Sequence, residues 1–214
     1  MRITLLGPGE VEYHFQELLK IPKSKFISEL ESISQTLVDS DVELDLLPDT
    51  GVSLEIARLY KKHGGKKVVA TLPLSDKTFG IKHLEKYRNE LINGKQLFDE
   101  EIDTGDWYKH DLTKGLFGNA ILYLGNSPGT EIERNGAVYL YKLMKGFKEN
   151  LDLARDKINP NIIADNNLSL LVYSPFIIGG NLSKEDESYI ERFGIKLFYI
   201  KDSKELKSII NKLR

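Results

Sequence analysis

The chain has 214 residues, of which 41% are hydrophobic and 29% charged, with a formal net charge of −2 at pH 7 and no cysteine. This composition is that of a globular protein long enough to bury a core, and we expect one domain over residues 1–214. The lack of cysteine excludes disulfides, thiolate catalysis and cysteine-ligated metals, and four scattered histidines without paired spacing lead us to expect no metal site. The balanced charge argues against broad binding to nucleic acid.

The apolar runs of the chain are all far shorter than the length that spans a bilayer, so the sequence indicates no membrane role. The first apolar segment, MRITLL, is short and is followed at once by Gly7 and Pro8, unlike a secretory signal. We therefore expect an initial strand and a cytoplasmic protein.

Strand and helix patterns alternate along the chain. The expected strands are short apolar or β-branched runs at 2–6, 42–47, 67–72, 120–124, 168–174 and 195–200. The expected helices carry apolar residues at helical spacing and lie at 26–37, 52–63 and 203–213. Asp202 or Ser203 could cap the last helix. The alternation predicts an α/β, Rossmann-like fold: a doubly wound, mostly parallel sheet with helices on both faces.

Three stretches fit this alternation less well, at about 10–25, 74–117 and 146–167. We interpret them as loops or short helices that decorate the sheet. The middle stretch contains Trp107 and His110, and its length suits a lid over a binding site.

Small-residue turns follow three of the expected strands: GPGE at 7–10, PDTGVS at 48–53 and GNSPGTE at 125–131. In open parallel sheets, ligands bind beyond the carboxyl ends of strands, where helix N-termini present free N–H groups. Such turns let backbone amides approach an anion, and their hydroxyl groups add donors. The candidate binding residues are Gly7, Pro8, Gly9, Asp49, Thr50, Gly51, Ser53, Gly125, Asn126, Ser127, Gly129 and Thr130.

Each turn taken alone is also what ordinary strand-to-helix connections contain. Three such turns together favour a site, and a nucleotide or another phosphorylated small molecule fits their chemistry. No further cofactor is assigned from the sequence.

The helix that begins after the third turn opens on acidic residues. Glu133 lies one turn inside it and can point toward the ligand edge of the sheet. A carboxylate does not help to bind phosphate, and suits a sugar hydroxyl or acid–base work better. Alternatively, Glu131 and Glu133 only stabilise the positive end of the helix, by about 0.3–1 kcal/mol each. Spacing does not separate these alternatives.

Two segments carry a resemblance to a known family. The run ELDLLPDTGVSLEIARLYKKHGGKKVVATLP (43–73) resembles the strand, glycine-rich turn, helix, GG, strand and proline pattern of the LOG-type Rossmann proteins, often labelled lysine decarboxylase-like. These belong to the SLOG superfamily, with the cytokinin-riboside phosphoribohydrolases and the molybdenum cofactor carrier proteins. The segment GNAILYLGNSPGTEIE (118–133) is similar to their ADAFIALPGGYGTLEE type of segment, with Gly129, Thr130 and Glu133 on the family's GGxGTxxE. The resemblance covers most of the chain outside the three decorated stretches and implies a divergent member.

The chain departs from this pattern in its loops. Asn126 and Ser127 replace the two glycines before the family's GT, and a shorter PDTG replaces the GGG loop, with only Gly51 matching. The resulting loop is narrower and more acidic.

A second departure concerns the family's catalytic arginine. Where active phosphoribohydrolases carry an RK or RN pair, this chain has His110 and Asp111, with Lys109 and Lys114 nearby. Stabilisation of a departing base or of a ribose phosphate would therefore depend on His110 or on a displaced lysine or arginine.

Several single residues have an ordinary structural interpretation beside the functional one. Asp49 could bind a ribose hydroxyl or coordinate a cation, or it could only serve turn geometry. His110 could donate to a phosphate or act in acid–base chemistry, or it could be an exposed surface residue. We expect Arg134 to form a surface ion pair, and Tyr139 and Leu140 to lie in the core or in a dimer contact.

The sequence leads to three hypotheses. The first is a SLOG-type binding protein, such as a carrier or sensor, for a nucleotide or phosphorylated small molecule. The second is a nucleoside-5′-monophosphate phosphoribohydrolase, in which Glu133 and His110 are the catalytic residues. The third is a structural subunit whose site is blocked by residues of 10–25 or 74–117. The resemblance also implies a homodimer.

Overall fold

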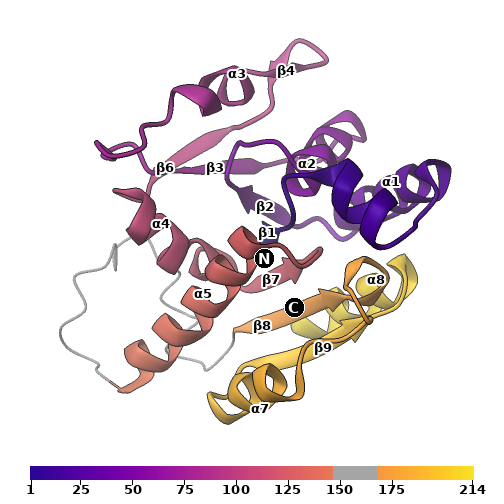
Figure 1. The fold of residues 1–214 in the computed structure, drawn as a ribbon. Helices are drawn as coiled ribbons and strands as arrows, with labels where there is room; N and C mark the ends of the chain where they lie inside the picture. The colour runs from indigo at the N-terminus through magenta and orange to yellow at the C-terminus, as the bar shows by residue number, and fades with distance from the viewer. Residues whose placement is uncertain (147–167) are drawn as a thin grey trace.

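The computed structural model describes residues 1–146 and 168–214, so nearly all of the decorated stretch 146–167 lies outside the described residues. It contains a parallel seven-stranded sheet in the order β6-β3-β2-β1-β7-β8-β9 (Figure 1). The strands are β1 (Arg2–Leu6), β2 (Glu43–Leu46), β3 (Val68–Leu72), β6 (Glu100–Asp103), β7 (Ala120–Tyr123), β8 (Ser169–Tyr173) and β9 (Lys196–Ile200). The expected α/β fold is confirmed.

The strand order reverses at β1. From this strand the chain adds β2, β3 and β6 on one side and β7, β8 and β9 on the other. Thr4 of β1 accordingly pairs with Asp45 of β2 and with Ile121 of β7. Such a reversal is the place where open α/β sheets bind ligands.

Helices cover both faces of the sheet (Figure 1). One face carries α1 (Lys23–Asp39), α2 (Val52–Lys62) and α8 (Ser203–Leu213), with α1 packed between the other two. The other face carries α5 (Pro128–Gly146), α4 (Trp107–Thr113) beside it, and α7 (Lys184–Arg192). Shorter elements are η1 (Glu12–Leu18), η2 (Lys82–Leu84), α3 (Glu85–Arg88), η3 (Lys114–Leu116), η4 (Ser174–Phe176) and the hairpin β4 (Leu91–Ile92) with β5 (Lys95–Gln96).

The strands supply both hydrophobic cores because their side chains alternate between the faces. On β7, Leu122 packs with α1 and α2, whereas Ile121 and Tyr123 pack with α5. Central strands of this kind are buried on both sides, which explains why their sequences are continuous apolar runs.

Most expected elements agree with the structure to within a few residues. The stretch 74–117 differs from the expectation, because it contributes the edge strand β6 to the main sheet as well as α3, α4 and the hairpin. The sequence analysis also assigned no element to α7, although Ser183 caps it by accepting from Asp186 N. The predicted cap of α8 is Asp202, whose carboxylate accepts from Glu205 N at 2.8 Å.

Every helix in residues 1–146 and 168–214 is too short or too polar to cross a membrane.

The turns after β1 and β2 touch at Gly51. This residue has φ of +134°, and a Cβ built on it would lie 2.6 Å from the Pro8 carbonyl oxygen. Val52 N donates to the same oxygen at 3.1 Å. Only glycine fits this contact, because any side chain would push the two turns apart.

We expect Gly51→Ala to lower the free energy of unfolding by about 3 kcal/mol or more, through backbone strain added to a backbone clash. Gly64→Ala is the matched control, since Gly64 also has a positive φ, of +90°, but has open space around it. Its cost is about 1 kcal/mol. Urea denaturation of both variants measures the difference, and equal losses would contradict the close approach.

Candidate functional site

The three predicted turns follow β1, β2 and β7, which are neighbours in the sheet. Together they line one pocket of about 170 Å³, which we call the corner pocket. It is lined by Gly7, Gly9, Leu47, Asp49, Thr50, Ser53, Lys114, Ser127, Gly129, Thr130 and Glu133. The turns therefore converge at the point where the strand order reverses.

A second pocket, of about 430 Å³, adjoins the first and shares Gly9 and Ser127 with it. We call it the outer pocket. It is lined by Pro8, Gly9, Glu10, Tyr13, His14, Leu18, Asn126, Ser127 and Pro128. Two of the sequence-predicted site residues, Pro8 and Asn126, thus face this pocket and not the corner pocket.

The turn after β7 is organised by its own side chains. Ser127 N donates to Thr130 Oγ1 at 2.8 Å, and this hydroxyl lies 3.0 Å from the carbonyl oxygen of Gly125. Thr130 N donates to Ser127 Oγ, which caps α5. The hydroxyl groups of Ser127 and Thr130, which the sequence analysis proposed as ligand donors, therefore already form hydrogen bonds within the turn. Gly125 begins the turn with a φ of +146° and lines neither pocket.

Asn126 ties the turn to its surroundings. Its Nδ2 donates to Glu131 Oε1 at 3.2 Å, and its Oδ1 accepts from Ile178 N at 3.1 Å. Asn126 thereby links the β7 turn to the segment after β8. The glycine found here in the resembled family could make neither bond.

The corner pocket retains several hydrogen-bond donors. The N-cap residue of α2, Gly51, provides no side-chain cap. Val52 N already donates to the Pro8 carbonyl oxygen, so the next N–H groups of this first turn, those of Ser53 and Leu54, are the ones left for a ligand. Ser53 Oγ is buried and has no hydrogen-bond partner among the described residues. An unpaired buried hydroxyl costs free energy, and an anion in the pocket would satisfy it.

Lys114 supplies the positive charge of the corner pocket. Its ammonium lies 2.7 Å from Glu133 Oε1, and the two residues are only 5% and 9% exposed. Lys114 is on η3 and reaches the pocket wall beside Glu133. The sequence analysis named it only as a neighbour, because spacing along the chain did not show that η3 would face the pocket.

His110 lies outside both pockets and is fully buried, so its interpretation as an exposed surface residue is wrong. Its Nδ1 lies 3.0 Å from Thr104 Oγ1, and Trp107 packs edge-on to its ring. Burial, with a smaller contribution from Lys114, lowers the His110 pKa well below its usual value. The imidazole is therefore neutral near pH 7.

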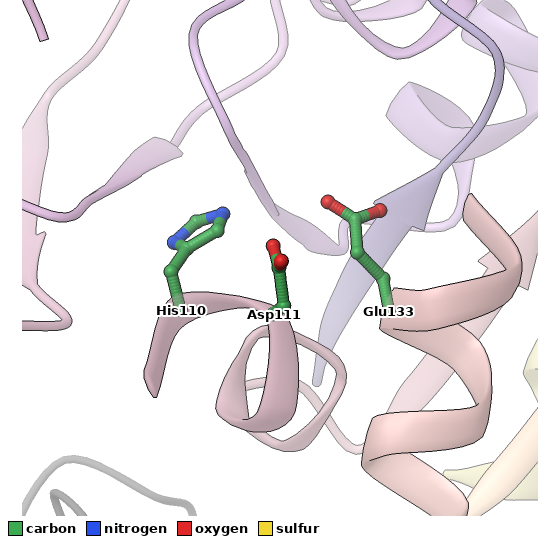
Figure 2. A group of neighbouring side chains, drawn as sticks. All are labelled: His110, Asp111 and Glu133. Carbon is green, nitrogen blue, oxygen red and sulfur yellow. The ribbon is translucent and has the colours of Figure 1, made fainter. Parts of the chain in front are cut away.

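Next to His110, Asp111 approaches Glu133. Burial, and then the charge of Glu133, raise the pKa of Asp111 to about 6, while Lys114 acts in the opposite direction. Figure 2 shows the imidazole and the two carboxylates grouped between α4 and α5. The two candidate catalytic residues, His110 and Glu133, are thus neighbours in space although only Glu133 lines the corner pocket.

Arg134 differs from its expected position. It forms an ion pair with Asp186 at 2.9 Å, but it is 1% exposed and lies over the Tyr123 ring. It is a buried link between α5 and α7, whereas a surface pair was expected. Of the two residues expected in the core or in a dimer contact, Leu140 is in the core and Tyr139 is exposed.

The comparisons with known proteins concern the fold. A scan against protein-family models and a search of curated proteins each found no match. Among solved structures, a protein called TM1055 is 15% identical with a TM-score of 0.57, over 99% of this chain and 98% of that chain. The molybdenum cofactor carrier protein of Chlamydomonas reinhardtii is 14% identical with a TM-score of 0.53, over 99% and 96%. The chain has the fold of these proteins.

The molybdenum cofactor binding protein of the phototrophic bacterium Rippkaea orientalis agrees equally well, with 14% identity and a TM-score of 0.54, over 99% of this chain and 96% of that chain. These neighbours confirm the fold that the resemblance in the sequence implied. At such low identity they carry no statement about ligand or activity.

A buried carboxyl group lies beneath the site. Asp45 of β2 accepts from Thr4 Oγ1 at 2.8 Å, and Gly118 N donates to the same hydroxyl. Complete burial raises the pKa of Asp45 to about 7, although the Thr4 hydrogen bond and the charges of Arg2 and Lys114 oppose this. The folded protein thus holds a proton here that the unfolded chain releases at lower pH.

We expect the free energy of unfolding to fall as pH rises from about 4 to about 7, with a slope approaching ~1.4 kcal/mol per pH unit from this group. The sign follows because the folded state binds more protons than the unfolded state in this window. Asp45→Asn removes the titrating group. Urea denaturation of the native protein and of Asp45→Asn at pH 5 and pH 8 measures the difference. The same change in the free energy of unfolding in both proteins would contradict a raised pKa of Asp45.

Proposed function

We propose that the protein binds a nucleotide or another phosphorylated small molecule in the corner pocket, as a binding or carrier protein of the SLOG type. The observation that carries this proposal is the convergence of the turns after β1, β2 and β7 on one pocket. Turns that only joined strands to helices would not need to meet around a cavity.

The chemistry of the pocket supports a phosphate group. The uncapped start of α2, the unpaired Ser53 hydroxyl and the Lys114 ammonium supply donors and positive charge. Asp49 and Glu133 oppose an anion, and Lys114 offsets Glu133 through their 2.7 Å contact. A carboxylate beside a phosphate site suits the hydroxyl groups of an attached sugar.

The volumes suggest how a larger ligand would lie. A pocket of about 170 Å³ is too small for a whole nucleotide but has room for a phosphate and part of an attached sugar, whereas the outer pocket of about 430 Å³ could take an organic ring. Tyr13 and Leu18 give that pocket an apolar wall. Because the pockets meet at Gly9 and Ser127, we propose that one ligand occupies both.

Two observations favour binding over the structural-subunit hypothesis. Residues of 10–25 and 74–117 line the pockets but leave both volumes open. Two solved neighbours are named as a molybdenum cofactor carrier protein and a molybdenum cofactor binding protein. Molybdopterin therefore belongs among the ligands to test.

Isothermal titration against nucleoside mono- and diphosphates, cyclic nucleotides and molybdopterin should identify at least one ligand. Ser53→Ala should weaken its binding about tenfold, because one hydrogen bond to a charged group is lost. Ser188→Ala, on the exposed side of α7, is the matched control and should leave affinity unchanged. The proposal fails if no member of the panel binds, or if both variants behave alike.

A phosphoribohydrolase is the second candidate, favoured by the position of Glu133 in the wall of the corner pocket. There its carboxylate would orient the ribose or stabilise oxocarbenium-like charge at the anomeric carbon while water attacks. Lys114 would supply the positive charge that an arginine supplies in the resembled family. His110 lies outside the pocket and would act on the substrate only through Asp111 and Glu133.

For this candidate we expect release of free base from a nucleoside 5′-monophosphate, reduced at least 100-fold in Glu133→Gln. Chromatographic detection of the base measures the activity. Intact nucleotide after prolonged incubation with the native protein would exclude the hydrolase and leave the binding proposal standing.

A further inference from the structure

One imidazole and two carboxylate side chains, all of types that can bind a metal ion, meet at the edge of the corner pocket. His110 and Asp111 lie on α4, and Glu133 lies on α5. One ligand atom from each residue falls within 4.8 Å of the other two. Figure 2 shows a ring nitrogen of His110 on the side that faces both carboxylates.

This histidine has an unused nitrogen. His110 Nδ1 already contacts Thr104 Oγ1, whereas Nε2 is buried and has no hydrogen-bond partner among residues 1–146 and 168–214. A buried polar atom without a partner costs about 1–3 kcal/mol. The orphaned nitrogen therefore points to a ligand in the space between the three side chains.

The charges of the cluster favour a cation. Lys114 contacts one oxygen of Glu133 at 2.7 Å, which leaves the second oxygen of that carboxylate for another partner. With both carboxylates ionised, Asp111 and Glu133 carry two negative charges against the single charge of Lys114. A cation between them would offset the remaining charge.

We propose that His110, Asp111 and Glu133 bind a divalent first-row transition metal ion of the Mn²⁺ or Zn²⁺ type. One imidazole nitrogen with two carboxylate oxygens suits such ions, whereas Mg²⁺ and Ca²⁺ prefer oxygen ligands alone. Ligands about 2.1 Å from an ion lie about 3–4 Å apart, so small side-chain rotations close the 4.8 Å arrangement around it.

Spacing along the chain hides this site, because His110 and Asp111 are adjacent and Glu133 comes from another helix. The expectation of no metal site rested on the absence of paired histidines and cysteines. The ligand set instead forms where α4 packs against α5.

A metal ion here would also account for acidic residues beside a phosphate pocket, a step that rests on the proposed function. Glu133 belongs to both the cluster and the wall of the corner pocket. A bound divalent ion would make that wall attractive to an anion. By thermodynamic linkage, the ion and the anion would then strengthen each other's binding equally.

The test uses the full-length protein, treated with a chelator and titrated with Mn²⁺ alone. Electron paramagnetic resonance measures free Mn²⁺, and we expect one site per chain. Asp111→Asn should weaken Mn²⁺ binding about tenfold or more. Glu17→Gln, which removes one charge from the exposed side of η1, should change it less than twofold. No Mn²⁺ binding, or equal affinity in both variants, overturns the proposal.

A second measurement keeps the test decisive if Asp111→Asn fails to fold. Bound Mn²⁺ broadens nearby amide signals in nuclear magnetic resonance spectra of the native protein. We expect broadening centred on His110, Asp111 and Glu133, with α8 unaffected. Broadening centred elsewhere would overturn the site.

Titration of inorganic phosphate with and without Mn²⁺ then tests the linkage. Tighter phosphate binding in the presence of Mn²⁺ supports both proposals. If phosphate binds with the same affinity in the presence and absence of Mn²⁺, the linkage is overturned but both sites remain. If phosphate does not bind at all, the result counts against the proposed function, and the Mn²⁺ titration still decides the metal site.

Discussion

The close approach of backbone segments at the carboxyl edge of the sheet is the constraint on which the site depends. Pro8 and Gly51 are in backbone contact, and a Cβ on Gly7 would lie 2.2 Å from Val52 Cγ1. These contacts leave no room for a side chain on Gly7 or on Gly51. The parallel pairing of β1 with both β2 and β7 then brings the third turn to the same edge. The pocket is thus a consequence of strand order and of two glycines.

In and beside the wall of the corner pocket, the structure buries more ionisable groups than a structural core requires. Lys114 and Glu133 form an almost fully buried pair, Asp111 lies beside them, and Asp45 is buried one strand away. Burying ions costs several kcal/mol each unless good partners offset it, and an apolar core would be at least as stable. Buried and perturbed ionisable groups of this kind cluster at functional sites. This reasoning, and not the fold alone, singles out the region between α4, α5 and β1.

The sequence predicted the fold well because the strands are continuous apolar runs and the turns contain strong breakers. It predicted β6 poorly, since Glu100 and Glu101 at an exposed edge carry no apolar pattern. For the site, it identified the turns but not the roles of their side chains. Thr130 and Asn126 proved to hold the turn together, and Lys114 entered the pocket from η3. Such roles depend on packing between distant segments, which local patterns do not encode.

The edge strand β6 has a consequence for the behaviour of the protein in concentrated solution. An unpaired strand edge can template the addition of another chain. Here Glu100 pairs with Lys67, and Glu101 pairs with Arg88 of α3, so paired charged side chains lie along this strand. A second molecule adding its own strand would have to bury these acids. The sheet therefore ends at β6 in a way that opposes the growth of fibres.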